Sequence, residues 1–393
     1  MKKVIITDLL ILAVFGSTCF WSVKKDRLTA LVDKILTEQT SEDEEILVLT
    51  SSNLAKKNGQ IEETQMSENA DKASEENTTK DYIKWADFTV SKFALTESYE
   101  YDRDTYGTDR HISWINLLAW TAAHTGGKFG DDRTVCKCME ELEMEAEAGK
   151  KLEELTEDLE YFSYYREVYE TVLGGMVGEY EIEEPDAQGR KVTQKRYGLK
   201  AFHPIAKGFP YTDYDDFGAS RSYGYRREHL GHDMMGQVGT PVVCVESGYV
   251  EALGWNQYGG WRIGIRSFDK KRYYYYAHLR QGFPYQPELK EGSVVLAGDV
   301  IGYMGHTGYS TKEDVNNIDQ THLHVGMQLI FDESQKDSDN EIWIDCYQII
   351  GFLCRNQSET ARNDETKEWR RIYEMKDPAA EKYERTLDFS MYP

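Results

Sequence analysis

Three short segments of this sequence hold the side chains that could do chemistry. They read His229-Leu230-Gly231-His232-Asp233, Tyr276-Ala277-His278-Leu279 and Thr321-His322-Leu323-His324. Imidazole nitrogens and carboxylate oxygens are ligands of zinc, and a catalytic zinc usually has three protein ligands and one open position for water. Four candidate ligands in two short segments are unusual in a purely structural protein. The set therefore predicts a zinc-dependent hydrolase.

The first segment is set in strand-like sequence, in which residues i, i+2 and i+4 share one face. His229 and Asp233 are therefore expected to point the same way. Gly231 lies between them and has no side chain, so it leaves room for a metal. His232 points to the other face and is not expected to be a ligand.

The third segment places His322 and His324 on a common face, so both can reach one site. We predict that zinc is held by His229, Asp233 and His324. His278 and His322 then lie beside the metal as the catalytic residues. One imidazole can take a proton from the zinc-bound water, whose pKa falls to about 7, and the other can donate to the developing oxyanion. The sequence leaves open which histidine plays which part.

Glycine turns and short motifs surround these segments in a fixed order. They are His229 to Asp233, Gly239-Thr240-Pro241-Val242, Tyr276 to Leu279, His306-Thr307-Gly308-Tyr309-Ser310 and His322 to His324. Over residues 227–329 this pattern resembles the lysostaphin/LytM family of zinc metallopeptidases, which cut peptidoglycan peptides. The resemblance implies one Zn²⁺ held by His229, Asp233 and His324. It also implies catalytic roles for His278 and His322, and an antiparallel β-sheet core with a groove walled by loops.

The sequence departs from the family pattern before the last motif. The family usually runs from the Ser310 turn to the final His-Leu-His almost directly, often through Gly-Pro. Here residues 312–320 are inserted and Thr321 stands in place of the proline. The insertion either walls the groove or is a tolerated surface loop, and the sequence favours neither. His306 is expected at the rim of the groove, and His203 lies before the motifs.

The bulk composition disfavours one class of partner. The 393-residue chain has a formal net charge of -23, from 69 Asp and Glu against 46 Lys and Arg. Nucleic-acid binding requires clustered cations, so no nucleic-acid partner is expected. The six cysteines form no Cys-x-x-Cys pair and suggest no disulfide framework. They are expected to be free or buried thiols.

The N-terminus predicts a membrane anchor or signal at residues 1–23. Lys2-Lys3 precede an apolar run over residues 4–23, which Asp8 interrupts. A basic start before an apolar stretch is typical of an export signal or an uncleaved anchor. We favour the anchor, which places the protein at the cell membrane with its catalytic domain extracellular and facing the cell wall. A cleaved signal and a buried helix are the alternatives.

The rest of the chain divides by composition into four parts, which predict an α+β, multidomain protein. Residues 24–80 are polar and acidic and are expected to form a flexible linker. Residues 81–195 have apolar positions at helical spacing and predict a helical domain. Residues 196–355 alternate β-rich runs with glycine turns, which predicts an antiparallel sheet, the LytM-like metallopeptidase domain, with one helix over residues 342–353 at its edge. Residues 356–393 form a charged tail.

These observations predict a zinc-dependent endopeptidase that hydrolyses peptidoglycan stem peptides or cross-links during cell-wall remodelling. The alternative is a catalytically silent LytM-like scaffold or binding protein of the cell envelope, for example in sporulation. Intact metal ligands count against that alternative. A third hypothesis gives the helical domain a regulatory role, in which it blocks the groove until a partner removes it. The sequence does not say which peptide bond is cut.

Overall fold

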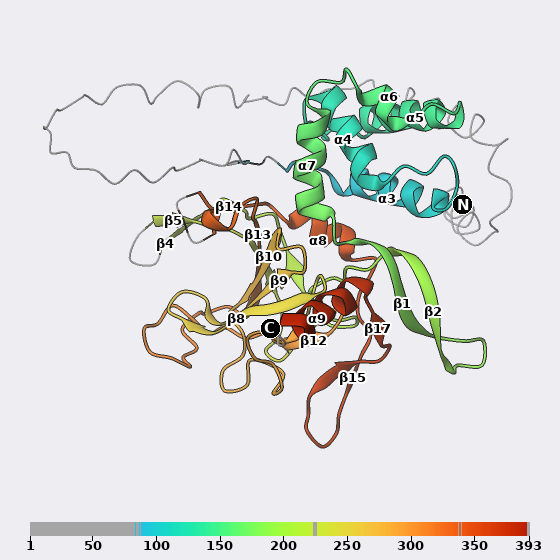
Figure 1. Cartoon of the computed structure of the whole chain (residues 1–393). Coiled ribbons are helices and arrows are strands. Elements are labelled where there is room, and N and C mark those ends of the chain that lie inside the picture. Colours follow the sequence, from blue (N-terminus) through green and yellow to red (C-terminus); the bar gives the residue numbers. More distant parts are fainter. Residues whose placement is uncertain are drawn as a thin grey trace, which may run out of the picture. The chain divides into compact units, whose positions relative to one another are not determined.

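The computed structural model describes residues 83, 86, 88–222, 226–336, 338 and 340–390 (Figure 1). All the elements below belong to the unit Thr78–Pro393. The predicted anchor at residues 1–23 and the predicted linker at residues 24–80 lie outside the described residues.

The predicted location at the cell membrane is corrected by the structure. Within the ranges described, no helix combines the length and the apolar character needed to cross a membrane.

The first described elements are helices, as the periodicity of residues 81–195 predicts for most of that range (Figure 1). They are α3 (Lys92–Thr105), α4 (Trp114–Thr125), α5 (Asp132–Glu147), α6 (Leu152–Thr156) and α7 (Phe162–Leu173). The Ser113 hydroxyl caps the start of α4 by accepting from the Asn116 N–H. Gly126 closes α4 in the left-handed conformation, with φ 62°, which glycine adopts without a steric cost. The helices bury a shared apolar face that includes Leu117, Leu118 and Val172.

The helices end earlier than the sequence predicts. Residues 177–199 form an antiparallel hairpin of β1 (Val177–Pro185) and β2 (Lys191–Leu199), and β17 (Met375–Lys376) pairs with β1. The turn of the hairpin has an Asp186 side chain that accepts from the backbone N–H groups of Gln188 and Arg190. The tight turn and the β-prone Val, Tyr and Ile of β1 favour a hairpin over a further helix.

The predicted antiparallel sheet is confirmed and forms the centre of the chain (Figure 1). Its strands follow the order β11-β8-β9-β10-β13-β6-β3, and β14 also pairs with β13. Their bounds are β3 Thr212–Asp213, β6 His232–Met235, β8 Gly248–Asn256, β9 Gly260–Ser267, β10 Arg272–Ala277, β11 Val294–Val295, β13 His322–Leu329 and β14 Ile342–Trp343. The middle strands bury residues such as Ile263, Tyr276 and Leu323 completely. That burial holds β10, β13 and β6 in one register.

Shorter elements surround this sheet. Two further antiparallel pairs are β7 (Pro241–Val243) with β12 (Val300–Tyr303) and β4 (Ser220–Ser222) with β5 (Arg226–Glu228). A short 3-10 helix, η1, spans Glu333–Gln335. The predicted helix over residues 342–353 is wrong in its first half, because β14 occupies Ile342–Trp343 and α8 spans only Tyr347–Leu353. Pairing with β13 outweighs helix propensity there.

The predicted charged tail carries regular structure. It contains the pair β15 (Thr360–Arg362) and β16 (Trp369–Arg371), then β17 and the helix α9 (Pro378–Ser390). Arg371 is almost buried and donates to the Ala297 carbonyl and to Asp299. A charge-rich segment of this kind can still pack when its cations find acceptors on the sheet domain.

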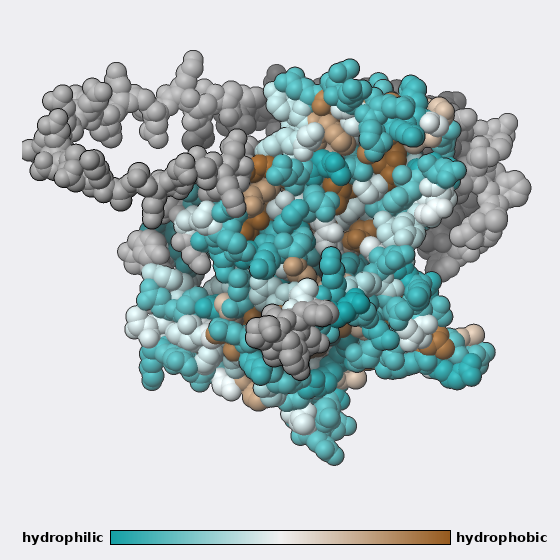
Figure 2. Space-filling model, viewed as in Figure 1, coloured by the Kyte–Doolittle hydropathy of each residue, from teal (hydrophilic) through white to brown (hydrophobic). Residues whose placement is uncertain are grey.

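The helices and the sheet share one continuous core of buried apolar residues. A buried arginine at the start of β10 also joins them. Arg272 pairs with Glu246 through two hydrogen bonds of 2.8 and 3.0 Å. Its Nη1 donates to the Thr171 carbonyl oxygen at the end of α7, at 2.7 Å. On the face shown in Figure 2, the surface is mainly hydrophilic and hydrophobic residues form small separate spots.

Candidate metal centre

The candidate ligands converge where strands β6 and β13 lie side by side. In their antiparallel register, His324 of β13 is directly opposite Asp233 of β6. His229 reaches the same point from the connection between β5 and β6. Its backbone is fixed by hydrogen bonds with Ala219 and Gly218, at 2.9 and 2.8 Å. The sequence predicted that His229 and Asp233 share one strand. This prediction is wrong, because β6 begins only at His232 and His229 lies before it.

Three ligand atoms of these residues face one another. His229 Nε2 lies 3.0 Å from Asp233 Oδ1 and 2.9 Å from His324 Nδ1. His324 Nδ1 lies 3.0 Å from the same Asp233 oxygen. In the described part of the chain, this trio is the one group of three or more such residues whose ligand atoms come close enough for a metal ion. Two nitrogens and one carboxylate oxygen directed at a common point fit a divalent cation such as Zn²⁺.

Gly231 makes room for this convergence. The sequence predicted that the missing side chain leaves space for the metal, but in the structure it leaves space for the ring of His324. A Cβ at Gly231 would lie 2.5 Å from Cε1 and 2.6 Å from Nε2 of His324. The space beside the glycine is thus filled by a ligand ring. His232 points elsewhere: its Nε2 lies 2.9 Å from Asp213 Oδ2, and its ring is 5.2 Å from the ring of Tyr347.

Outer hydrogen bonds set the ring tautomers. His229 Nδ1 lies 3.1 Å from the Asp216 carbonyl oxygen, so the donor is Nδ1–H and Nε2 keeps its lone pair for the cluster. His278 Nδ1 donates in the same way to the Thr307 carbonyl at 3.0 Å, and His322 Nδ1 to the Gln320 carbonyl at 2.8 Å. Each of these three histidines therefore directs its Nε2 away from its backbone acceptor.

His278 and His322 lie beside the three ligands. Their ring centroids are 4.6 Å apart, and His322 Nε2 lies 3.7 Å from Asp233 Oδ1. His278 follows directly on β10 and has a left-handed backbone, with φ 60°. Such a conformation is strained in a residue with a Cβ and often marks a functional position. It is held by a hydrogen bond from the His278 N–H to the Gly259 carbonyl at 2.8 Å.

Burial and mutual charge perturb the cluster. Burial alone would raise the pKa of Asp233, but the neighbouring rings of His229 and His324 outweigh it, and the pKa falls well below its usual value. Burial lowers the pKa of His278 well below its ordinary range. Burial also lowers the pKa of His324, although Asp233 opposes that effect. The carboxylate is therefore charged and these two imidazoles are neutral, which are the states that bind or assist a metal.

Two further residues support the centre and were missed by the sequence reasoning. Arg221 Nη2 donates to Asp233 Oδ2 at 2.9 Å and also pairs with Asp216. Asp216 is buried and also accepts, through its carbonyl oxygen, from His229. Neither residue stands in a recognisable motif. Only the fold of β4 and the preceding loop brings them to the ligands.

The cluster lies in a groove of about 670 Å³. The lining includes Asn317, Ile318, Asp319 and Gln320, so the second half of the inserted segment forms part of the wall. His306 sits outside the groove lining and fixes this wall, because its Nδ1 lies 2.7 Å from the Ile318 carbonyl oxygen.

The remaining histidines lie away from the centre. His203 is completely buried beside Ile205. His111 pairs with Asp102 at 2.7 Å, and His124 Nδ1 lies 2.9 Å from the Trp120 carbonyl oxygen.

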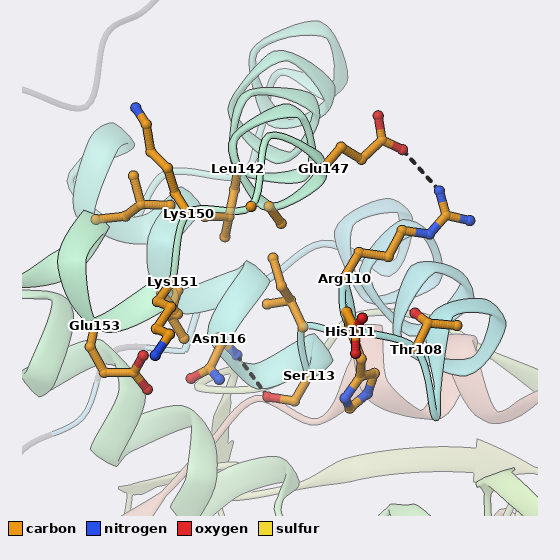
Figure 3. A pocket seen from close by; sticks show the side chains of 16 residues that line it. Thr108, Arg110, His111, Ser113, Asn116, Leu142, Glu147, Lys150, Lys151 and Glu153 are labelled. Atoms are coloured by element: carbon orange, nitrogen blue, oxygen red, sulfur yellow. Dashed lines mark hydrogen bonds and ion pairs between the residues drawn. The ribbon is translucent and has the colours of Figure 1, made fainter.

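A larger hollow of about 930 Å³ lies among the helices (Figure 3). Its lining combines apolar residues such as Leu142 with charged residues such as Arg110 and Glu147. Arg110 pairs with Glu147 at 2.9 Å, as the dashed line in Figure 3 shows, and Lys150 pairs with Glu145 at 2.6 Å. The charges around it thus neutralise one another in part, and no group of three metal ligands is found among its described residues.

Comparison with known proteins identifies the domain that holds this centre. Residues 227–338 match the model of Peptidase family M23. The L-Ala–D-Glu endopeptidase of Bacillus subtilis (strain 168) is 40% identical over 124 residues, which are 32% of this chain and 36% of that protein. Glycyl-glycine endopeptidase ALE-1 of Staphylococcus capitis is 32% identical over 123 residues, 31% of each chain. The chain thus spans about a third of the length of these relatives.

A solved structure of the catalytic domain of lysostaphin from Staphylococcus simulans is 29% identical, with a TM-score of 0.29. The match covers 36% of this chain and 92% of that one. Residues 227–338 match the Peptidase family M23 model, and the resemblance to the lysostaphin/LytM family that the motifs predicted is confirmed.

Proposed function

We propose that this lysostaphin/LytM-type domain is a zinc-dependent endopeptidase that hydrolyses peptide bonds in peptidoglycan stem peptides or cross-links, in cell-wall remodelling. The observation that carries the proposal is the trio His229, Asp233 and His324, with two further imidazoles beside it in one groove. The matched relatives are an L-Ala–D-Glu endopeptidase and a glycyl-glycine endopeptidase. These names support peptide hydrolysis but point to different bonds.

His229, Asp233 and His324 would hold the Zn²⁺. Bound there, the metal would supply a Lewis acid for the scissile carbonyl and lower the pKa of a water molecule. The ligand atoms already converge, so little rearrangement of the side chains is needed. Arg221 holds the second oxygen of Asp233, which leaves Oδ1 directed at the two imidazoles.

His278 and His322 are the proposed catalytic residues. One neutral Nε2 accepts a proton from the attacking water as its oxygen bonds to the peptide carbon. The other imidazole donates from Nε2 to the developing oxyanion, which it does in the form that holds a proton on both ring nitrogens. When the C–N bond breaks, the proton taken from water passes to the leaving amine. Both rings donate from Nδ1 to a backbone carbonyl, His278 to Thr307 and His322 to Gln320. This similarity leaves open which histidine accepts the proton and which donates to the oxyanion.

The test is digestion of purified peptidoglycan by the zinc-loaded full chain, with the released muropeptides identified by mass spectrometry. His324→Ala and Asp233→Ala are each expected to lose bound zinc and to slow cleavage by at least about a hundredfold, because each removes a metal ligand. His124→Ala is the matched control, since His124 is exposed on α4 and bonds only to the Trp120 carbonyl. Cleavage that persists in both ligand variants would refute the proposal.

The alternative of a silent scaffold makes a different prediction. A scaffold would bind muropeptides and leave them intact even when zinc is bound. The convergent donor atoms and the two further imidazoles count against this reading, because a binding protein has no need of them.

A further inference from the structure

The charge of the groove suggests which peptides it accepts. Among the described residues that line it, the cations other than histidine are Arg221 and Arg227. They are directly opposite each other in the β4–β5 pair. Like charges at paired positions repel unless anions compensate them. Arg221 is compensated by Asp216 and Asp233.

Arg227 has no such compensation in the described part of the chain. Two carboxylates of the groove lining, Glu228 and Asp319, are exposed, and neither forms an ion pair with it. Its neighbours are instead aromatic and neutral: Cζ lies 5.0 Å from the ring centroid of Tyr258 and 5.1 Å from that of Tyr309. The guanidinium is thus an uncompensated positive charge on the wall of the groove.

The two tyrosines also fix the orientation of the guanidinium. Arg227 Nη2 donates to the Tyr309 hydroxyl at 2.7 Å, while both rings attract the cation. A fixed planar guanidinium loses little side-chain entropy on binding, and its geometry matches a carboxylate. Arg227 is therefore built to receive an anion with two oxygens.

Arg227 lies close to the reaction centre. The ring of Tyr309, which contacts Arg227, is 6.0 Å from the ring of His278. A peptide advances about 3.3–3.6 Å per residue when extended. A peptide bond placed at His278 and the metal ligands would therefore put a group one to a few residues away beside Arg227.

We propose that Arg227 is a specificity-determining residue that binds a carboxylate of the peptide substrate within a few residues of the scissile bond. The substrate class is an acidic peptide, as opposed to an uncharged glycine-rich one. This inference rests on the proposed endopeptidase function and narrows its substrate. The net charge of the whole chain, -23, would by itself repel an acidic peptide. A local cation such as Arg227 offsets this repulsion at the groove.

The experiment uses two synthetic peptides that differ in one group. One carries a glutamate carboxylate next to the bond that is cut, and the other carries a carboxamide at that position. The zinc-loaded full chain is expected to cleave the carboxylate peptide with a kcat/KM about 10- to 100-fold higher, the range of one charge-assisted contact. In Arg227→Gln this ratio is expected to fall to about 1, mainly through a higher KM for the carboxylate peptide.

Arg227→Lys keeps the charge but loses the planar fork, so it is expected to recover part of the preference. Equal cleavage of the two peptides by the wild type would overturn the inference. So would an equal loss of both activities in Arg227→Gln, since a structural role would not distinguish the peptides. Thermal melting of each variant checks that it folds.

Failure of the proposed function gives a separate result. If the wild type cuts neither peptide and also releases no muropeptide from peptidoglycan, the same two peptides are compared by dissociation constant. Tighter binding of the carboxylate peptide, lost in Arg227→Gln, would still support Arg227 as the anion site. Equal dissociation constants would reject it.

Discussion

At the scale of single residues, the metal centre depends on hydrogen bonds that orient His229 and Asp233 from the side opposite the metal site. The Asp216 carbonyl orients the ring of His229, and Arg221 occupies the second oxygen of Asp233. Such outer contacts commonly change metal affinity by about 10- to 100-fold when they are removed. A ligand set alone therefore does not account for the site.

Gly231 gives the sharpest test of this packing. We expect Gly231→Ala to lower zinc affinity at least about tenfold, because the new Cβ would lie 2.5 Å from Cε1 of His324 and 2.7 Å from the Val325 carbonyl oxygen. The measurement is competition with a zinc chelator. Gly130→Ala is the matched control, since no atom lies within 4 Å of its added Cβ. Equal zinc affinities in the two variants would contradict the packing argument.

His203 gives a prediction about pH that is independent of the metal. Burial lowers the pKa of His203 from 6.5 to about 4. In the unfolded chain His203 therefore binds a proton below about pH 6.5, whereas in the folded chain it binds that proton only below about pH 4. The stability associated with the neutral ring is present above pH 6.5 and is lost as the pH falls to about 4, by about 3 kcal/mol in all.

Urea unfolding of the wild type and of His203→Gln at a series of pH values between 4 and 7 measures this effect. The free energy of unfolding should fall less steeply with acid in the variant, whatever its absolute stability. Parallel curves would show that the buried ring does not titrate as described.

At the scale of elements, register decides the site. The pairing of β13 with β6 sets His324 opposite Asp233, and the pairing of β13 with β10 sets His324 opposite Ala277, just before His278. A shift of either strand by one residue would turn these side chains to the other face of the sheet. The large apolar residues of the middle strands, such as Tyr276 and Leu323, make such a shift costly.

The start of β10 is fixed by the buried pair of Arg272 and Glu246, to which the Tyr274 hydroxyl also donates at 2.7 Å. Glu246→Leu is expected to lower the free energy of unfolding by about 3–5 kcal/mol, because it leaves the arginine charge buried with only Asp269 as its carboxylate partner. Denaturant unfolding measures the loss. Asp104→Asn removes an exposed pair with Arg103 and should cost no more than about 1 kcal/mol. Similar losses in the two variants would show that the buried pair has no special weight.

At the scale of the whole molecule, the helices and the sheet depend on each other. Arg272 of the sheet donates to Thr171 of α7, and the buried residues of both parts form one continuous core. No described residue from 81–195 lines the groove. The structure therefore gives no support to a helical region that blocks the groove, and the regulatory hypothesis remains a prediction.

Truncation separates these views. A fragment of residues 196–334 would lose α7, β14 and α8, and with them the Thr171 acceptor and the buried Ile349 and Phe352. We expect it to melt at a lower temperature, or without a cooperative transition, and to be less active than a chain that begins at Thr78. Circular dichroism and peptide cleavage measure both properties. A stable fragment with higher activity than the longer chain would instead favour inhibition by the helices.

The sequence by itself predicted the parts of this protein that depend on local pattern. The spacing of the histidines and the aspartate named the candidate ligands, alternation and glycine turns predicted the antiparallel sheet, and the motifs predicted the lysostaphin/LytM family. It failed in the first half of the helix predicted over residues 342–353, which becomes the strand β14 because β13 is available to pair with it. In the charged tail, the strand β17 likewise depends on pairing with the distant β1.

Only the tertiary structure decided which other side chains reach the centre. Arg221, Asp216 and Arg227 stand in no motif, and they come to the groove through the β4–β5 pair and the loop before it. Their partners lie up to 82 residues away along the chain, as for Arg227 and Tyr309. Local pattern reports which face of an element is buried, but it holds no information on which elements meet, since that follows from the packing of the whole core.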